Sequence, residues 1–274
     1  MVIQKAVIPV AGQGVRLNPV TKVVPKELLP VLNKPLIDYI LEELIEAGIN
    51  QIGIVTSRRK PLIKEYLTSS SQPHTLLSKH RNVDLQFIFQ EVPNGLGNSI
   101  LKAKEFIADS PFIVCLPDDL VFHRISTVKQ LQNKYRSLQH SLVGVVTVPI
   151  HQISNYGIVK PLNQLEEVSF KADYFVEKPI PENAPSNLAV IGRYLFTKKL
   201  MDLLGKYSGL VPNDDLLTKA KNALAQENSV SAVHIAGTRI DAGSALGITQ
   251  AAIHELCQQP EEWDQLNTFL TSLL

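Results

Sequence analysis

Short apolar runs alternate with segments of helical period along most of the chain. Residues 6–10 and 52–56 are typical of buried strands, whereas 35–47 carries its apolar side chains along one helical stripe. Other segments with these patterns are the expected strands at 85–89, 112–116 and 142–148 and the expected helices at 61–67 and 98–107. Such alternation predicts an α/β fold with a Rossmann-like, mixed but mostly parallel sheet that is flanked by helices.

The balance shifts toward strands in the second half of the chain. An inserted β-rich region that forms the far wall of a cleft is predicted by runs at 156–160, 172–177 and 189–196. A polar stretch rich in Ser and His after 61–67 is expected to be a loop, and residues from about 244 are mostly helical. Because no clear linker interrupts the chain, we expect one domain over 1–274, with parts at 1–150, 151–243 and 244–274.

A glycine turn follows the first expected strand. Gly12 and Gly14 let the backbone turn tightly, and the bare amides there can face the oxygen atoms of a phosphate. Pro19 and Pro25 argue against a long helix after the turn.

Two common glycine motifs do not fit this turn. The dinucleotide fingerprint GxGxxG needs a third glycine where this chain has Leu17, and a Walker A loop needs Gly-Lys-Ser/Thr after its spacer. A purely structural strand-to-helix turn is the alternative for an isolated GxG. The flanking cations Arg16 and Lys26 favour a phosphate site.

Composition permits an enzyme without indicating which one. The 27 Lys and Arg nearly balance the 26 Asp and Glu, so neither nucleic acid nor a membrane surface is indicated as a partner. The N-terminal apolar run is too short for a signal peptide, and none elsewhere approaches membrane-spanning length. Cys115 and Cys257 lack metal or redox spacing and are expected to be reduced and buried. These features predict a soluble, cytoplasmic protein.

Several motifs in order connect the chain with a known family. Between residue 5 and about 256 it contains AGQGVR, PKELLPVLNKPLI, QEVPNGLGNSI, LPDDLV, YGIV, VEKP, APSNLAVIGRYLF and IDAGSALG. With these motifs it resembles the bacterial UTP:glucose-1-phosphate uridylyltransferases, within the sugar-1-phosphate nucleotidyltransferases. The resemblance implies the nucleotidyltransferase fold, with 1–150 mainly binding nucleotide and 151–243 mainly binding sugar. It also implies Mg²⁺-assisted transfer of a uridylyl group from UTP to glucose 1-phosphate, and a homo-oligomer, either dimer or tetramer.

The resemblance also assigns a metal site. Asp118 in LPDDL and Asp241 in RIDAG match the two metal-binding aspartates of the family, and carboxylate oxygens suit Mg²⁺. Asp119 would point elsewhere on an extended backbone, so the adjacent pair is not assumed to chelate one ion. Taken alone, Asp118 is explained at least as well as a helix cap or turn residue, and Asp241 as a plain cap.

Substrate-binding residues follow from the same matches. Arg16 and Lys26 match residues that hold the triphosphate, and Lys178 in VEKP matches one that contacts the sugar phosphate. The other matches are the phosphate turn at Ala11, Gly12 and Gly14, the base at Gln90 and Gly95, and the sugar at Gly157, Glu177 and Asn187.

Three departures from the family's pattern keep other functions open. Val15 replaces the threonine of GxGTR, Asn98 replaces a histidine after LG, and 209–220 differs from GGEIQLTDA. A dTTP-using thymidylyltransferase would share the fold and the aspartates, and a catalytically weak regulatory paralogue would tolerate the changes. A dinucleotide-dependent oxidoreductase is suggested by the GxG turn alone, and the missing third glycine counts against it.

Overall fold

One mixed sheet forms the centre of the molecule. The computed structural model describes residues 3–69, 76–80, 82–162 and 168–273. Within them, nine strands pair in the order β5–β4–β1–β6–β11–β8–β12–β10–β9. They are β1 (Lys5–Pro9), β4 (Gln51–Thr56), β5 (Asp84–Phe89), β6 (Phe112–Cys115), β8 (Ser141–Thr147), β9 (Gly157–Pro161), β10 (Ser169–Glu177), β11 (Leu188–Phe196) and β12 (Val230–His234).

Most of these strands point in the same direction. β5, β4, β1 and β6 are parallel neighbours, as are β8 and β12. β11 runs antiparallel to β6 and β8, and β10 runs antiparallel to β12 and β9. The predicted mixed, mostly parallel sheet is therefore confirmed, and strands from 1–150 and 151–243 share it.

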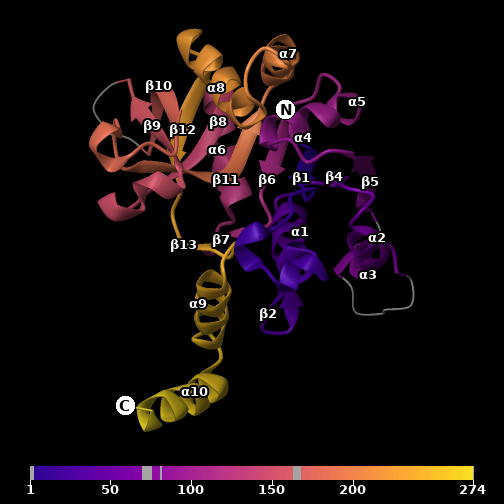
Figure 1. Cartoon of the computed structure of the whole chain (residues 1–274), viewed down its shortest axis with the longest axis vertical. Coiled ribbons are helices and arrows are strands. Elements are labelled where there is room, and N and C mark those ends of the chain that lie inside the picture. Colours follow the sequence, from indigo (N-terminus) through magenta and orange to yellow (C-terminus); the bar gives the residue numbers. More distant parts are fainter. Residues whose placement is uncertain (1–2, 70–75, 81, 163–167, 274) are drawn as a thin grey trace.

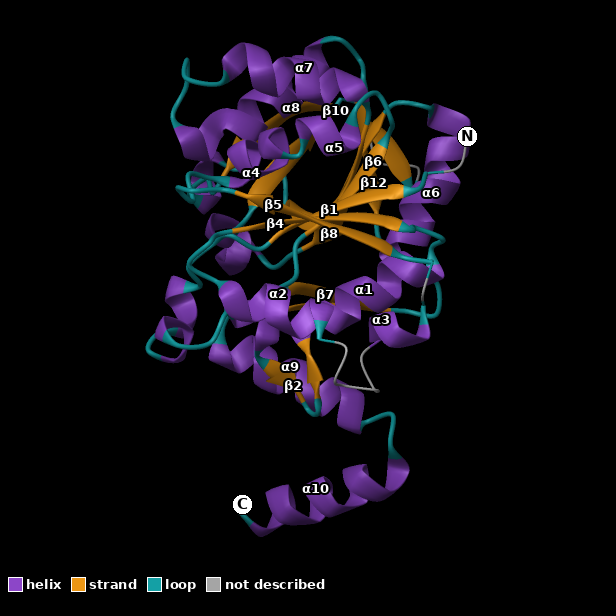
Figure 2. Ribbon diagram, turned by 90° about the vertical axis from the view of Figure 1, so that its right-hand side faces the viewer, coloured by secondary structure: helices purple, strands orange, loops and turns teal. Residues whose placement is uncertain are grey.

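Helices cover both faces of the sheet (Figure 2). One face carries α1 (Leu36–Glu46), α2 (Pro61–Thr68) and α6 (Thr127–Leu138); the other carries α4 (Leu96–Lys102), α5 (Lys104–Ile107), α7 (Lys198–Tyr207) and α8 (Leu216–Gln226). The stripe predicted over 35–47 forms α1, in which Ile37, Ile40 and Leu44 are fully buried. Two apolar cores thus hold the strands and their ends in place.

The C-terminal helices extend from this body. α9 (Ala245–Leu256) leads away from the sheet, and α10 (Pro260–Ser272) stands apart from it in Figure 1. Cys115 is buried as expected, but Cys257 is exposed, so that part of the prediction is wrong. The physical reason is that Cys257 ends α9 beyond the core. No helix in the described ranges is long and apolar enough to cross a membrane.

The hydrophobic pattern of the sequence does not predict short or interrupted elements. The helix expected at 98–107 divides at Ala103, and the region expected to be β-rich also contains α7 and α8. In the polar stretch after α2, α3 (Leu76–Lys79) is helical, while 70–75 and 81 lie outside the described residues. Small sheets not predicted are β2 (Pro30–Val31) with β3 (Lys34–Pro35), and β7 (Asp119–Phe122) with β13 (Thr238–Asp241).

The segment between β1 and β2 contains no long helix, as Pro19 and Pro25 predict. It forms three 3₁₀ turns instead, at Val15–Leu17, Val20–Lys22 and Lys26–Leu28. Pro19 and Pro25 directly precede the second and third of these turns. This segment remains an irregular loop over the strand ends, which leaves its side chains available for a site.

A fully buried arginine connects the layers beneath these strand ends. Arg193 in β11 donates through Nε and Nη2 to Glu43 Oε2 at 3.0 and 2.7 Å, and through Nη1 to the carbonyls of Leu116 and Gly192, both at 3.0 Å. Glu43 in α1 also accepts from Val128 N at 2.9 Å. Burial would lower the pKa of Arg193, but the charge of Glu43 outweighs it and keeps that pKa above its ordinary value.

Replacing Arg193 with methionine should lower the free energy of unfolding by about 3–5 kcal/mol, because Glu43 then keeps a buried charge without its partner. The exposed pair Arg58–Glu91, with side chains 69% and 68% exposed, supplies the control. Arg58→Met should have little effect, because exposed ion pairs contribute little. Urea unfolding measures both; equal losses in the two variants would contradict the structural role of Arg193.

Candidate functional site

Two clefts meet where the parallel strands end. The loop cleft, of about 500 Å³, opens beside the turn after β1, and the wall cleft, of about 430 Å³, faces the strands of the second half. Both volumes suit small-molecule sites. Asp118, which follows β6, lines both clefts. Ten further predicted residues line one cleft each: Ala11, Gly12, Lys26, Gln90 and Gly95 the loop cleft, and Arg16, Gly157, Glu177, Lys178 and Asp241 the wall cleft.

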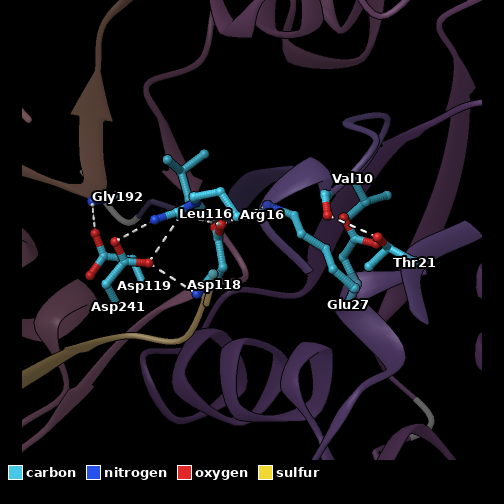
Figure 3. Close-up of polar contacts among 12 residues, drawn as sticks. Val10, Arg16, Thr21, Glu27, Leu116, Asp118, Asp119, Gly192 and Asp241 are labelled. Atoms are coloured by element: carbon cyan, nitrogen blue, oxygen red, sulfur yellow. Dashed lines mark hydrogen bonds and ion pairs between the residues drawn. The ribbon is translucent and has the colours of Figure 1, made fainter. Parts of the chain in front are cut away.

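Two aspartates and two cations form a charge-balanced cluster where the clefts meet (Figure 3). Lys26 Nζ donates to Asp118 Oδ2 at 2.6 Å. Arg16 donates through both terminal nitrogens to the Asp241 carboxylate, at 3.0 and 3.1 Å. Arg16 Nη2 also lies 3.7 Å from Asp118 Oδ2. The fold thus brings together four predicted residues that lie far apart in the sequence.

The small β7–β13 sheet places Asp118 and Asp241 side by side. Asp119 is opposite Asp241 in its register, and Ala242 N donates to the carbonyl of Asp118 at 2.8 Å. Gly243 leaves room for Arg16, because a Cβ atom there would overlap with Arg16 Nη2. Gly243, the first of the two glycines in the IDAGSALG motif, is therefore required for this approach.

Asp119 binds partners other than those of Asp118, as expected for neighbours on an extended backbone. Its carboxylate accepts from Arg239 Nε and Nη2 at 2.7 and 3.1 Å, and from Gly192 N at 2.8 Å. Because Arg239 lies in β13 and Gly192 in β11, Asp119 joins three strands. The adjacent carboxylates therefore have separate sets of partners.

The cluster fits a divalent metal. Burial would raise the pKa of Asp118, but Lys26 and Arg16 outweigh burial and hold that pKa below its ordinary value. Asp118 and Asp241 already converge on one cationic group, the Arg16 guanidinium. In the described part of the chain, no group of three or more acidic, His or Cys side chains is placed to hold an ion. Further ligands would therefore be phosphate oxygens and water, as Mg²⁺ often takes.

A buried ion pair supports the loop that carries Lys26. Glu27 is fully buried, and Lys60 Nζ lies 3.0 Å from its Oε2 and 2.8 Å from the carbonyl of Val10. Burial raises the pKa of Glu27, and the charges of Lys60 and Lys26 oppose that rise. Sequence reasoning missed this pair, because no spacing links Glu27 with Lys60.

Gln90 holds a fixed position in the loop cleft. It is 1% exposed; its Oε1 accepts from Ser99 Oγ at 2.6 Å, and its Nε2 donates to Asn94 Oδ1 at 2.8 Å. A primary amide has two donor hydrogens and two acceptor lone pairs. One of each therefore remains for a ligand, and the bonds to Ser99 and Asn94 fix their direction.

The Gly95 turn rests against the segment that departs most from the family's pattern. Its φ of +94° favours glycine, and a Cβ atom there would lie 2.7 Å from the carbonyl oxygen of Asn213. Asn98 Nδ2 donates to Asn213 Oδ1 at 2.9 Å. Two of the departures, Asn98 and 209–220, are therefore in direct contact.

The predicted sugar-side residues are only partly brought together. Glu177 ends β10 opposite Gly157, where a Cβ atom would lie 3.0 Å from Glu177 Oε2. Lys178 Nζ lies 4.0 Å from Glu177 Oε1, and its side chain is 62% exposed. Gly14, predicted for the phosphate turn, lines neither cleft, and its carbonyl accepts from Thr21 Oγ1 at 2.9 Å; Asn187 is exposed and lines neither cleft. The ligand contacts of these residues remain predictions.

Two further residues of the wall cleft were not predicted from the sequence. Lys221 of α8 is 2% exposed and Tyr194 of β11 is 5% exposed, and both line the cleft. Lys221 lies on the buried face of α8 with Leu217 and Leu224. A lysine within an apolar helical stripe is the signal that could have identified it.

Comparison with known proteins identifies the family of this chain. The nucleotidyl transferase family matches residues 5–255. A UTP–glucose-1-phosphate uridylyltransferase of Streptococcus pneumoniae is 35% identical over 287 aligned positions, which cover 99% of this chain and 96% of that protein. Of solved structures, a UDP-glucose pyrophosphorylase complexed with UDP-glucose has a TM-score of 0.86 at 36% identity and covers 94% of this chain and 100% of its own. A UTP-bound UGPase from Acinetobacter baumannii has a TM-score of 0.87 at 33% identity, and the match covers 99% of this chain and 100% of that one. The chain therefore belongs to the nucleotidyl transferase family, within its UTP–glucose-1-phosphate uridylyltransferases.

Proposed function

We propose that the protein transfers a uridylyl group from UTP to glucose 1-phosphate and so forms UDP-glucose and pyrophosphate. The observation that carries this proposal is the convergence of Asp118, Asp241, Arg16 and Lys26 where the two clefts meet. Such a junction allows a nucleotide in one cleft and a sugar phosphate in the other to meet at their phosphates. Two of the similar structures support the proposal, because one is a complex with UDP-glucose and the other is bound to UTP.

The reaction depends on electrostatics rather than on a general base. Phosphate monoesters have a second pKa of about 6, so glucose 1-phosphate is mainly a dianion at pH 7. Its phosphate oxygen forms a bond to the α-phosphorus of UTP while the bond to the leaving pyrophosphate breaks. Because both substrates are polyanions, cations that hold them in line supply most of the catalysis.

Substrate binding exchanges partners within the cluster. Asp118 and Asp241, now bound to cationic side chains, would hold Mg²⁺, which neutralises phosphate charge when bound. Arg16 and Lys26 then become available to the β- and γ-phosphates; Arg binds such groups in a bidentate manner and Lys binds as a point charge. The exposed Lys178 would bind the phosphate of the sugar.

Two alternatives share this site. Gln90 would hydrogen-bond uracil, but thymine differs by one methyl group, so Gln90 alone does not separate UTP from dTTP. A regulatory, catalytically weak protein is favoured by one observation: Val15, 65% exposed in the loop cleft, offers no hydroxyl group. The four charged residues of the cluster favour an active enzyme.

Self-association and a cytoplasmic location complete the proposal. α10 contributes no buried residue; Phe269 and Leu270 on it and Leu273 directly after it expose apolar side chains. Apolar groups gathered on one exposed element often mark a protein–protein interface. We therefore place the contact of a dimer or tetramer at α10.

Pyrophosphate release tests the reaction directly. With glucose 1-phosphate as acceptor, turnover should be fastest with UTP, slower with dTTP, CTP and ATP, and dependent on Mg²⁺. A preference for dTTP would establish the thymidylyl alternative. Absence of turnover with every nucleotide would exclude the enzyme and favour the regulatory protein.

Asp118→Ala should lower turnover by several orders of magnitude, because stabilisation by a metal contributes several kcal/mol. In calorimetric titrations with UTP present, Mg²⁺ should bind more weakly to Asp118→Ala than to the unmodified protein. Asp109→Ala is the matched control, because Asp109 is 80% exposed and pairs with Lys198. Near-normal turnover of Asp118→Ala would show that the metal assignment is wrong.

The contact at α10 is tested by light scattering after size exclusion. The intact chain should give a multiple of its 30.3 kDa mass. Phe269→Ser with Leu270→Ser should reduce that mass, because it removes exposed apolar area from α10, whereas Asn267→Ala on the same helix should not. A monomeric intact chain would refute self-association, and an unchanged double variant would refute its placement.

A further inference from the structure

The ammonium group of Lys221 lies in the wall cleft without a polar partner. Among the described residues, it makes neither a hydrogen bond nor an ion pair, although the residue is 2% exposed. Its Nζ lies 4.7 Å from the centre of the Phe175 ring, which stabilises a cation only in part. Burial lowers the pKa of Lys221 to about 8, and the charge of Glu177 opposes that fall. Because the residue is almost fully buried while its Nζ reaches the cleft without a polar partner from the described part of the chain, a ligand in the cleft can supply that partner.

The neighbours of Lys221 fix its position. Asn222 fastens α8 to β10, because its Oδ1 accepts from Phe175 N at 2.6 Å and its Nδ2 donates to Phe175 O at 3.0 Å. Phe175 and Glu177 are two residues apart on β10, so their side chains share one face of the strand. Lys221 therefore meets that face, with Phe175 beside its ammonium, and Glu177 lines the same cleft.

Three polar groups with complementary hydrogen-bonding capacity line this part of the cleft. Lys221 only donates, ionised Glu177 only accepts, and the Tyr194 hydroxyl does both. In the described ranges none of the three side chains makes a hydrogen bond, and Glu177 has Lys178 Nζ at 4.0 Å as its ion-pair partner. Adjacent hydroxyl groups of a sugar both donate and accept, so one sugar ring can satisfy the whole set.

We propose that Lys221 is a specificity-determining residue, which donates hydrogen bonds to a ring hydroxyl group of the hexose 1-phosphate while Glu177 accepts from a neighbouring one. This inference rests on the proposed function, because it takes the wall cleft as the sugar site. A sugar without the contacted hydroxyl leaves Lys221 buried and unpaired, and sites of that kind reject such analogues strongly.

The test compares the unmodified protein with Lys221→Met, which keeps a long apolar stem and removes the ammonium. Rates are measured with UTP and either glucose 1-phosphate or its 2-, 3-, 4- or 6-deoxy analogue. For glucose 1-phosphate, kcat/KM of the variant should fall by about 10–100-fold, the effect of losing a hydrogen bond to a charged group. KM for UTP should stay unchanged.

Discrimination between sugars is the second readout. One deoxy analogue should be a poor substrate of the unmodified protein, and Lys221→Met should no longer distinguish it from glucose 1-phosphate. Lys219→Met is the matched control: Lys219 is exposed on the same helix, its ammonium lies over the Tyr207 ring, and its replacement should change neither readout. Unchanged discrimination in Lys221→Met would overturn the proposal.

Thermal unfolding separates recognition from a structural role. Lys221→Met should unfold at the same or a higher temperature, because it removes an unpaired buried charge. A lower unfolding temperature, or failure to fold, would show that Lys221 is structural and would overturn the proposal. If the unmodified protein does not use glucose 1-phosphate, the proposed function fails; if it does and Lys221→Met behaves identically, this inference alone fails.

Discussion

The ion pair between Asp119 and Arg239 is the interaction on which the candidate site depends. It joins β7 to β13, and the bond from Gly192 N to the same carboxylate adds β11. Both side chains are nearly buried, 10% and 13% exposed, so breaking the pair would leave a charge without compensation. Since Asp118 precedes Asp119 and Asp241 follows Arg239 closely, this pair determines the separation of the two candidate metal ligands.

A second constraint is the neutrality of the cluster itself. Two carboxylates and two cations lie together, so the free protein holds no unbalanced charge at the junction of its clefts. The proposed reaction would replace these internal pairs with pairs to the metal and the phosphates, so the charges that meet the polyanionic substrates are already gathered before the substrates arrive.

Much of the fold follows from local pattern, whereas the assembly of the site does not. The sequence alone predicts β1, β4 and α1, because the pattern of buried apolar residues within each segment determines whether it is a strand or a helix. The contact of Arg16 with Asp241 depends on the order of the strands, which no local pattern contains; only the family resemblance connected them. α8 was not predicted, because the runs around it favour strands. Lys221 was not predicted to be buried either, because a charged residue is normally expected on an exposed face. Asn187, which a matched motif assigned to the sugar, is exposed and lines neither cleft, so its contact with the sugar stays a prediction.

The segment around α8 borders both clefts, and this has a thermodynamic consequence. Asn213 contacts the Gly95 turn and Asn98 on the nucleotide side, while Lys221 stands on the sugar side of the same short segment. A displacement of this segment by either ligand would alter the wall that the other ligand meets. Linkage makes such an effect reciprocal: if bound nucleotide changes the affinity for the sugar phosphate by some factor, bound sugar phosphate changes the affinity for the nucleotide by the same factor. The part of the chain least like its family is thus the part through which the two substrates can influence each other's binding.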